Sequence, residues 1–280
     1  MITGWLFDIY CLDDKIVLWI KDESRLYKIE KQWTPSLYVA SNSPSKLKRL
    51  ENHPLLNPFV KNCKKTNKIQ SVFDTDESSV LQLTLKNSKD ILKLAKSIEK
   101  LDTFGVYKLY NVDVPPEQTY LYENDLYPLG KYQIKKDDKI KWDELSDIAD
   151  TNYVLPILRK TILKVYPKTN KPIPNFSDAI EKIQIDDIII KSKSEQEMIL
   201  TCVEYIQNLD PDILITYSGD SWDFPYLAER AFRNKILDKL VFGREDNRPI
   251  LRSKRKVTSY FAYGQVHFKP LQPNFWAEFT

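Results

Sequence analysis

The sequence is poor in the residues from which disulfide frameworks and histidine-based sites are built. Only three cysteines, Cys11, Cys63 and Cys202, occur in 280 residues, and they stand far apart. This pattern predicts neither a disulfide framework nor a zinc site. The two histidines, His53 and His267, are not spaced as metal ligands or as members of a catalytic triad. We therefore expect no chemistry that depends on histidine.

Long apolar runs are absent as well. No stretch approaches the roughly 20 apolar residues that span a bilayer, and the N-terminal MITGWLFDIYCLDD lacks the basic region and cleavage site of a signal peptide. We expect a cytoplasmic protein without a membrane partner. The composition, 42% hydrophobic and 29% charged, is typical of a folded chain. The length favours two domains.

The net charge of +3 is too small to establish a polyanionic partner, but the positive charge is unevenly distributed. Basic clusters would attract a phosphate backbone through counterion release, although solvated surface lysines explain them equally well. The compact run that contains Arg252, Lys254, Arg255 and Lys256 lies outside any apolar pattern, so packing does not readily explain it. This run is our best candidate for DNA contact. The other clusters lie at 61–68, 131–141 and 159–171.

Hydrophobic periodicity predicts a mixed α+β domain over residues 1–130. A helix is expected after Asn87, because apolar residues recur at helical spacing from Ile91 to Leu101. The charged segment 131–152 has little periodicity and is interpreted as a linker. Strands are predicted at 4–12, 15–21, 36–40, 79–86 and near 104–112.

Residues 153–280 alternate strand and helix patterns, which predicts an α/β domain with a helix-covered sheet. The apolar runs TILKV, IQIDDIII and ILITY indicate strands. Ser194 and Glu197 have the spacing of a capping box before an amphipathic helix. A second helix is expected from Phe224 onward.

The stretch Tyr217 to Tyr226, YSGDSWDFPY, places a carboxylate, Asp223, between a strand and a helix. An acid there lies in the crevice beyond the carboxyl end of a strand, where α/β folds commonly bind ligands. The structural alternative is that Asp223 caps the helix that follows.

The run LDPDILITYSGDSWDFPYLAERA closely resembles the second exonuclease motif of family B DNA polymerases. Three other segments, GWLFDIY, WTPSLYV and LYNVDVPPEQTYLYENDLYP, look like the N-terminal domain of archaeal members, and SYFAYGQVHFKP looks like a segment of diverged archaeal paralogues. The resemblance implies an RNA-recognition-like N-terminal domain followed by an incomplete ribonuclease H-like exonuclease domain. Ser218 stands where the family usually has Asn.

The first exonuclease motif of active relatives is Asp-x-Glu on a strand, and period two puts both acids on one face. By resemblance this strand is Arg159 to Tyr166, which leaves Lys164 and Tyr166 at the two acidic positions. Since cleavage by two metal ions needs several carboxylates, we expect the exonuclease to be inactive. A lysine there would repel a divalent cation and satisfy Asp223 directly.

Two other acidic stretches could replace the acids of the first motif. Asp186 and Asp187 are expected on the next strand, where only one of the two could face the site; with Asp223, Asp186 is a weak metal candidate, and Mg²⁺ would be the cofactor if the site were active. Asp8, in FDIY, superficially resembles the first motif but lacks the glutamate.

The remaining surface is interpreted as a DNA-holding one. Trp222 and Tyr226 are candidates for stacking on unpaired bases, whereas Phe224 is expected to pack the helix against the sheet. The resemblance further implies a pocket that reads template uracil. The positions that correspond to it are Pro35, Ser36, Val114 and Pro116, although turn and core packing explain them too.

We therefore expect the N-terminal and exonuclease-like portion of an archaeal family B DNA polymerase, nucleoid-associated and bound to primer-template or single-stranded DNA. No polymerase motif follows, so we expect a truncated chain or a split-gene product whose partners are a separate polymerase portion and replication factors. The alternatives are an active metal-dependent exonuclease and a non-catalytic module for replisome assembly.

Overall fold

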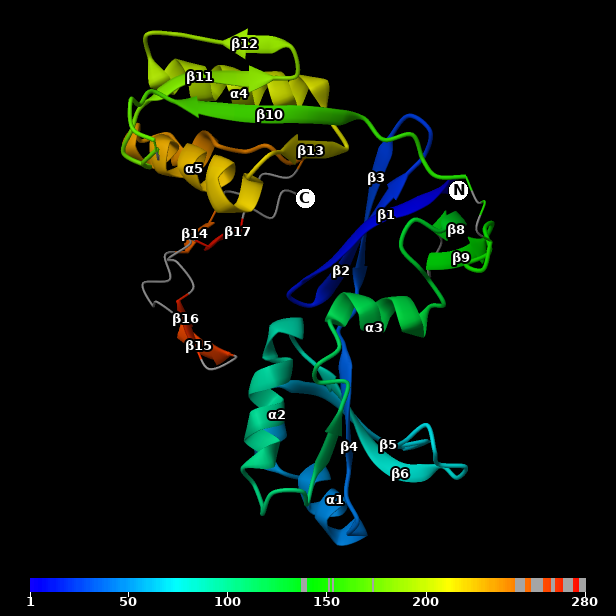
Figure 1. Ribbon diagram of the computed structural model, residues 1–280. Coiled ribbons are helices and arrows are strands. Elements are labelled where there is room, and N and C mark those ends of the chain that lie inside the picture. The colour runs from blue at the N-terminus through cyan, green and yellow to red at the C-terminus, as the bar shows by residue number, and fades with distance from the viewer. Residues whose placement is uncertain are drawn as a thin grey trace. The chain divides into compact units, whose positions relative to one another are not determined.

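The computed structural model describes residues 1–136, 140–150, 152, 154–172, 174–244, 250–252, 259–262, 265–268 and 274–276. The chain divides into two compact units, Met1–Ile157 and Leu158–Thr280 (Figure 1). The first unit contains two sheets, each with its own core, and the second unit has a main sheet and core of its own. Among the described residues, no helix has the length and apolar character needed to cross a membrane.

The first unit begins with an antiparallel five-stranded sheet in the order β3-β2-β1-β8-β9. Helix α3 (Pro116–Glu123) covers it and contributes Tyr120 and Leu121 to a core with Leu6, Leu18 and Ile134. The strands are β1 (Ile2–Leu12), β2 (Lys15–Lys21), β3 (Leu26–Gln32), β8 (Lys131–Lys136) and β9 (Ile140–Glu144).

The expectation of a linker over residues 131–152 was wrong for its first part. Strand β8 pairs with β1, and β9 pairs with β8, so this segment completes the N-terminal sheet. The charged residues that hid it alternate with buried Tyr132 and Ile134, as in a strand with one wet face.

A second sheet of four antiparallel strands, in the order β5-β6-β4-β7, completes the first unit. Its elements follow one another in the chain as β-α-β-β-α-β. They are β4 (Ser36–Ala40), α1 (Pro44–Glu51), β5 (Val60–Lys68), β6 (Ser78–Leu85), α2 (Ile91–Glu99) and β7 (Lys108–Tyr110), with short helices at Pro54–Leu56 and Ser88–Asp90.

Both long helices of this sheet pack on one of its faces. Leu47 and Leu50 of α1 and Leu94 and Ile98 of α2 belong to one core with the strand residues Leu37, Val39, Leu81 and Leu83. The predicted helix after Asn87 and the strands at 36–40 and 79–86 are confirmed. The sequence interpretation missed α1, α3, β3 and β5, whose apolar residues are few or irregularly spaced.

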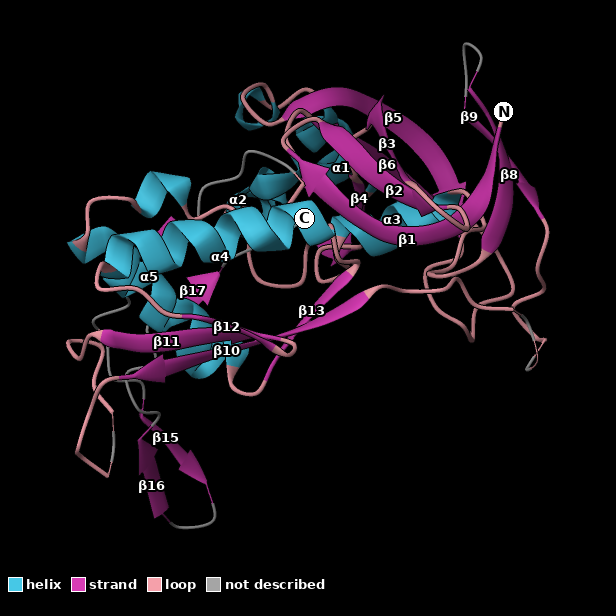
Figure 2. Cartoon of the chain, turned by 90° about the horizontal axis from the view of Figure 1, so that it is seen from above, coloured by secondary structure: helices cyan, strands magenta, loops and turns pink. Residues whose placement is uncertain are grey.

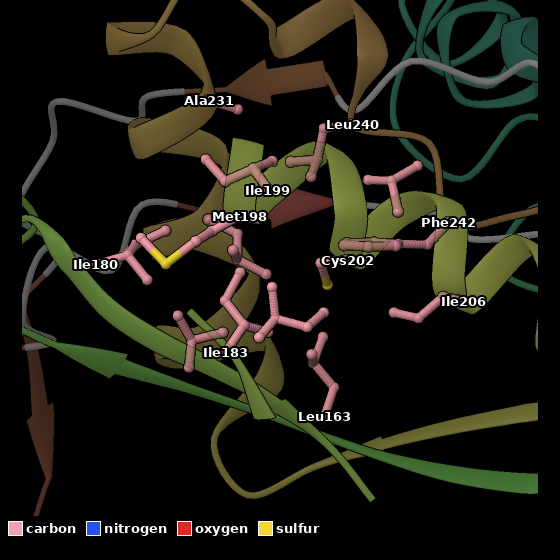
Figure 3. Packing of buried hydrophobic residues seen from close by; sticks show 14 of the residues in the cluster. Leu163, Ile180, Ile183, Met198, Ile199, Cys202, Ile206, Ala231, Leu240 and Phe242 are labelled. Atoms are coloured by element: carbon pink, nitrogen blue, oxygen red, sulfur yellow. The ribbon is translucent and has the colours of Figure 1, made fainter. Parts of the chain in front are cut away.

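The second unit contains a mixed sheet in the order β12-β11-β10-β13, seen from above in Figure 2. Strand β10 runs parallel to β13 and antiparallel to β11. Helices α4 and α5 contribute to one core beneath it, in which Leu163 and Ile183 meet Met198, Cys202 and Ile206 (Figure 3). The elements are β10 (Lys160–Pro167), β11 (Ile180–Ile185), β12 (Ile188–Ile190), α4 (Glu195–Leu209), β13 (Ile213–Thr216), α5 (Phe224–Arg233), a short helix at Leu237–Lys239, β14 (Ile250–Arg252), β15 (Ser259–Ala262), β16 (Gln265–Phe268) and β17 (Asn274–Trp276).

The Asp-Pro-Asp turn is a structural clamp at the start of β13. Asp210 adopts the left-handed conformation (φ 44°) that ends α4. Its carboxylate receives the guanidinium groups of Arg159 (2.7 Å) and Arg244 (2.5 Å), and Asp212 accepts the Arg159 backbone N–H at 2.9 Å. These charged groups therefore fix where β10 and β13 begin.

A second clamp, between Glu195 and Arg230, joins α4, α5 and β11. The two Glu195 oxygens accept Arg230 Nε at 2.7 Å and Nη2 at 2.6 Å, and they also accept the Ile180 N–H and the Asn234 amide. Burial pushes the pKa of Glu195 upward, but the hydrogen bonds from Arg230, Asn234 and Ile180 outweigh it and hold the pKa below its ordinary value. The carboxylate is therefore stabilised in its charged form.

Glu195→Ala is expected to lower the free energy of unfolding by about 3 kcal/mol at pH 7, because it leaves the largely buried Arg230 guanidinium without its carboxylate. Glu204→Ala, on the exposed side of the same helix, is the matched control and should cost much less. A depressed carboxylate pKa contributes stability above the unfolded pKa and loses it on acidification. Urea titrations at pH 7 and pH 3 should therefore show the Glu195→Ala deficit shrinking at pH 3, and an equal deficit in the control would contradict this assignment.

Candidate functional site

Asp223 lies at the carboxyl end of the parallel β10–β13 pair and is 6% exposed. The pairing of these strands ends at Leu163 opposite Thr216. Beyond that point the Asp223 carboxylate accepts the backbone N–H of Val165, and its Oδ2 accepts the N–H of Ser218 at 3.1 Å. The side chain thus accepts hydrogen bonds at the point where β13 no longer pairs with β10.

Asp223 does not cap α5, so the capping alternative was wrong. Its own backbone is helical and its side chain makes no cap hydrogen bond. Residues Gly219–Asp223 form one wide turn that leads directly into α5, with the Trp222 N–H donating to Ser218 O at 2.7 Å. A Cβ on Gly219 would lie 2.2 Å from Thr216 Oγ1, so this turn requires glycine.

Burial dominates the electrostatics of Asp223. Desolvation raises the pKa of its carboxyl, and the two backbone hydrogen bonds from Ser218 and Val165 offset this only in part. The Asp223 carboxylate thus serves as a structural hydrogen-bond acceptor.

Lys164 and Tyr166 lie on the face of β10 opposite the buried Leu163 and Val165. Tyr166 donates its hydroxyl to Gln184 Oε1 at 3.0 Å, and the Lys182 ammonium lies 4.3 Å from its ring centre. Within the described chain no ion pair joins Lys164 to Asp223. The expectation that Lys164 satisfies Asp223 directly was therefore wrong, since backbone amides do so.

The acidic pair Asp186-Asp187 lies in the turn between β11 and β12, not on a strand as expected. Asp186 is left-handed (φ 49°), and its Oδ1 accepts the Ile162 N–H at 2.7 Å. Backbone N–H groups alternate between the two sides of a strand, so the carboxylates of Asp186 and Asp223 hydrogen-bond to opposite sides of β10. Among the side chains that the structure describes, no group of three His, Cys, Asp or Glu residues is placed to hold a metal ion.

Comparison with known proteins agrees with this architecture. Residues 166–269 match the exonuclease domain of DNA polymerase family B. The chain is 25% identical over 273 residues to a DNA polymerase of Pyrococcus horikoshii, covering 90% of this chain and 20% of that protein. It is 27% identical over 214 residues to DNA polymerase 1 of Pyrococcus abyssi, covering 72% of this chain and 24% of that protein. The chain is thus similar to archaeal DNA polymerases over most of its length.

The fold is similar to that of a solved polymerase structure. The family B DNA polymerase of Pyrobaculum calidifontis superimposes with a TM-score of 0.69 and 17% identity, over 90% of this chain and 35% of that one. This chain therefore spans about a third or less of the length of these polymerases. The matched exonuclease domain starts at Tyr166, after the position of Lys164.

The two aromatic residues predicted to stack on DNA bases differ in their surroundings. Tyr226 is fully buried and donates its hydroxyl to Asp178 O at 2.8 Å, so its assignment to DNA was wrong. Trp222 is half-buried and lies in a stack of three rings, 4.9 Å from Phe176 and 5.1 Å from Tyr226. Phe224 packs against the core, as predicted.

One exposed aromatic residue beside Asp223 was missed. Tyr217 is 93% exposed at the end of β13. The sequence interpretation treated ILITY as a uniformly apolar run, although Ile215, on the same face, is also 40% exposed. Alternation within this run is the signal that could have revealed a half-open strand.

The remaining predicted residues are only partly described. Lys254, Arg255 and Lys256 lie outside the described residues, and Arg252 is placed by its backbone in β14. Pro35 and Ser36 are buried beside β6, and Ser36 Oγ lies 2.9 Å from Thr84 Oγ1. Val114 and Pro116 are half-buried just before and at the start of α3. Recognition of uracil at these positions stays a prediction.

Asp223→Ala is expected to lower the free energy of unfolding by about 1–3 kcal/mol, because two buried N–H groups lose their acceptor. Asp223→Asn should cost less, since it retains one carbonyl acceptor and removes a charge whose burial is unfavourable. A raised carboxyl pKa also means that the deficit of Asn relative to wild type grows as the pH falls toward the unfolded pKa of Asp. Denaturant titrations at pH 7 and pH 4 measure both effects; equal losses for Asn and Ala at pH 7 would contradict this role.

Proposed function

We propose that this chain is the N-terminal and exonuclease-like portion of a family B DNA polymerase that binds primer-template or single-stranded DNA without hydrolysing it. The observation that carries the proposal is the pair Lys164 and Tyr166 on β10, next to an Asp223 whose carboxylate is engaged by two backbone amides. The exonuclease-like fold is retained, and the described residues do not assemble the acids needed for cleavage.

Hydrolysis by two metal ions requires carboxylates that bind both ions, roughly 3.5 to 4 Å apart. The described residues do not fit such a site. Asp223 is buried and Asp186 hydrogen-bonds to the other side of β10. By the sequence resemblance, Lys164 stands at an acidic position of the first exonuclease motif. Mg²⁺ is therefore not proposed as a cofactor of this chain.

The N-terminal unit supports the same proposal. Its second sheet follows the order β-α-β-β-α-β with helices on one face, which is the order of the RNA-recognition-like domain. The matched segment covers only 20% of the Pyrococcus horikoshii polymerase and 35% of the Pyrobaculum calidifontis one. DNA, a separate polymerase portion and replication factors are accordingly the proposed partners. The proposed location is the cytoplasm, in association with the nucleoid.

Two competing functions make different predictions. An active exonuclease would need carboxylates beyond those described near Asp223. A module that only assembles a replisome would not bind DNA at all. The open aromatic Tyr217 beside Asp223 favours contact with nucleic acid.

Labelled single-stranded DNA and primer-template should be bound by the chain and remain at full length with Mg²⁺ or Mn²⁺. The archaeal relative from Pyrococcus horikoshii provides a parallel reaction for comparison. Binding should weaken steeply with salt. Charge reversal at Arg252, Lys254, Arg255 and Lys256 should weaken it further. Metal-dependent shortening that Asp223→Ala abolishes would defeat the inactive assignment, and absence of binding at low salt would favour the assembly module.

A further inference from the structure

The sheet β5-β6-β4-β7 has one face without a helix, and this face has an unusual charge composition. Helices α1 and α2 pack on the face that carries Leu37, Val39, Leu81 and Leu83. No Asp or Glu occurs in any of the four strands, whereas they contain the lysines Lys61, Lys64, Lys65, Lys68 and Lys108. The strands therefore present positive charge alone.

One row of side chains crosses the helix-free face from edge to edge. In register, Lys64 of β5 lies opposite Gln82 of β6, Gln82 opposite Tyr38 of β4, and Tyr38 opposite Tyr110 of β7. Side chains that are directly opposite on neighbouring strands lie about 5 Å apart. The row thus places two adjacent aromatic rings beside an amide and an ammonium group.

Hydrogen bonds and a cation hold these rings in place. Tyr110 donates its hydroxyl to Gln70 Oε1 at 2.9 Å, and Gln70 also contacts Ser78 at the end of β6. The Lys68 ammonium lies 5.9 Å from the centre of the Tyr38 ring. Tyr38, Gln82 and Tyr110 are all partly exposed and Lys64 is exposed, so the row is ordered and accessible within this sheet.

Negative charge lies only at the margins of this face. Asp74, Asp76 and Glu77 are in the loop between β5 and β6, outside the strands. Burial raises the pKa of Tyr38, and the charge of Glu123 on α3 raises it further. The Glu123 carboxylate already accepts the Trp33 indole N–H at 3.0 Å.

We propose that the row Lys64, Gln82, Tyr38 and Tyr110 is a binding surface for single-stranded DNA. Unpaired bases present flat faces to the tyrosines, the Gln82 amide offers a hydrogen bond to a base edge, and Lys64 and Lys68 contact phosphates. A duplex keeps its bases stacked on one another and cannot use the rings. The choice of DNA rests on the proposed function, whereas the surface lies in the other compact unit from Asp223.

The sharpest test uses two adjacent lysines of β5 whose side chains point to opposite faces. Lys64 is in register with Gln82 on the helix-free face, and Lys65 is in register with the core residue Leu81. Both are exposed. Lys64→Glu and Lys65→Glu therefore make the same change of charge at neighbouring positions, and only the first alters the proposed surface.

Binding of a fluorescent oligothymidylate is measured by anisotropy across a salt series. Lys64→Glu should weaken binding about fivefold to tenfold at low salt and reduce the salt slope by about 1, the change expected for one lost phosphate contact. Lys65→Glu should change neither by more than about twofold. The double variant Tyr38→Leu, Tyr110→Leu should weaken binding of the single strand more than binding of a duplex of the same length. Circular dichroism verifies that each variant is folded.

The outcomes separate this inference from the proposed function. If Lys64→Glu and Lys65→Glu behave alike while charge reversal at 252–256 abolishes binding, the sheet surface is wrong and DNA binding elsewhere stands. If wild type binds no DNA at low salt, the proposed function fails first. A preference for the corresponding RNA strand that Lys64→Glu removes would overturn the assignment to DNA. Photo-crosslinking of a 5-bromodeoxyuridine strand should label peptides that contain Tyr38 or Tyr110.

Discussion

The hydrogen bonds of the Asp223 carboxylate are the contacts on which the carboxyl ends of β10 and β13, in the second unit, depend. Strands β10 and β13 pair only as far as Leu163 and Thr216, and the chain then turns away through Gly219–Asp223 into α5. By accepting the N–H groups of Val165 and Ser218, Asp223 supplies the hydrogen bonds that the missing continuation of β13 would have made. A buried N–H without an acceptor is costly, so this side chain helps to hold the wide turn against β10, in addition to the core contacts of α5.

The local chemistry at this edge of the sheet differs from that of a cluster of carboxylates. Several carboxylates in one cleft repel each other and require cations to remain ionised together. At this edge of the sheet the buried acid Asp223 has neutral amides as partners, while Lys164 and Tyr166 lie on the exposed face of β10. The second cluster of acids, Asp210 and Asp212, lies at the opposite ends of the strands and is neutralised by Arg159 and Arg244. Each acid thus has a partner within the fold.

Sequence patterns predicted the elements that are determined by residues close together in the chain. Alternation identified β2 and β4, and the Ser194 hydroxyl accepts the Glu197 N–H as the capping pattern indicated. Contacts between distant segments were not predictable in this way. The hairpin turn at Asp186 was hidden inside an apolar run, and the partner of Asp223 is an amide on a strand almost 60 residues earlier, at Val165. A propensity for capping is a property of one residue and its neighbours, whereas this contact depends on the register of β10.

The two units divide their chemistry differently because their sheets expose different faces. In the second unit the open side of β10 and β13 carries Ile162 and Ile215, which are in register and 44% and 40% exposed. Apolar side chains of that size on an open sheet favour contact with protein surface, since their burial removes them from water. In the first unit the helix-free face carries lysine, amide and tyrosine side chains and no acid. Such a face gains little from apolar contact and much from a polyanion with exposed aromatic bases. The β-α-β-β-α-β sheet is therefore better suited than the open side of β10 and β13 to hold a nucleic-acid strand.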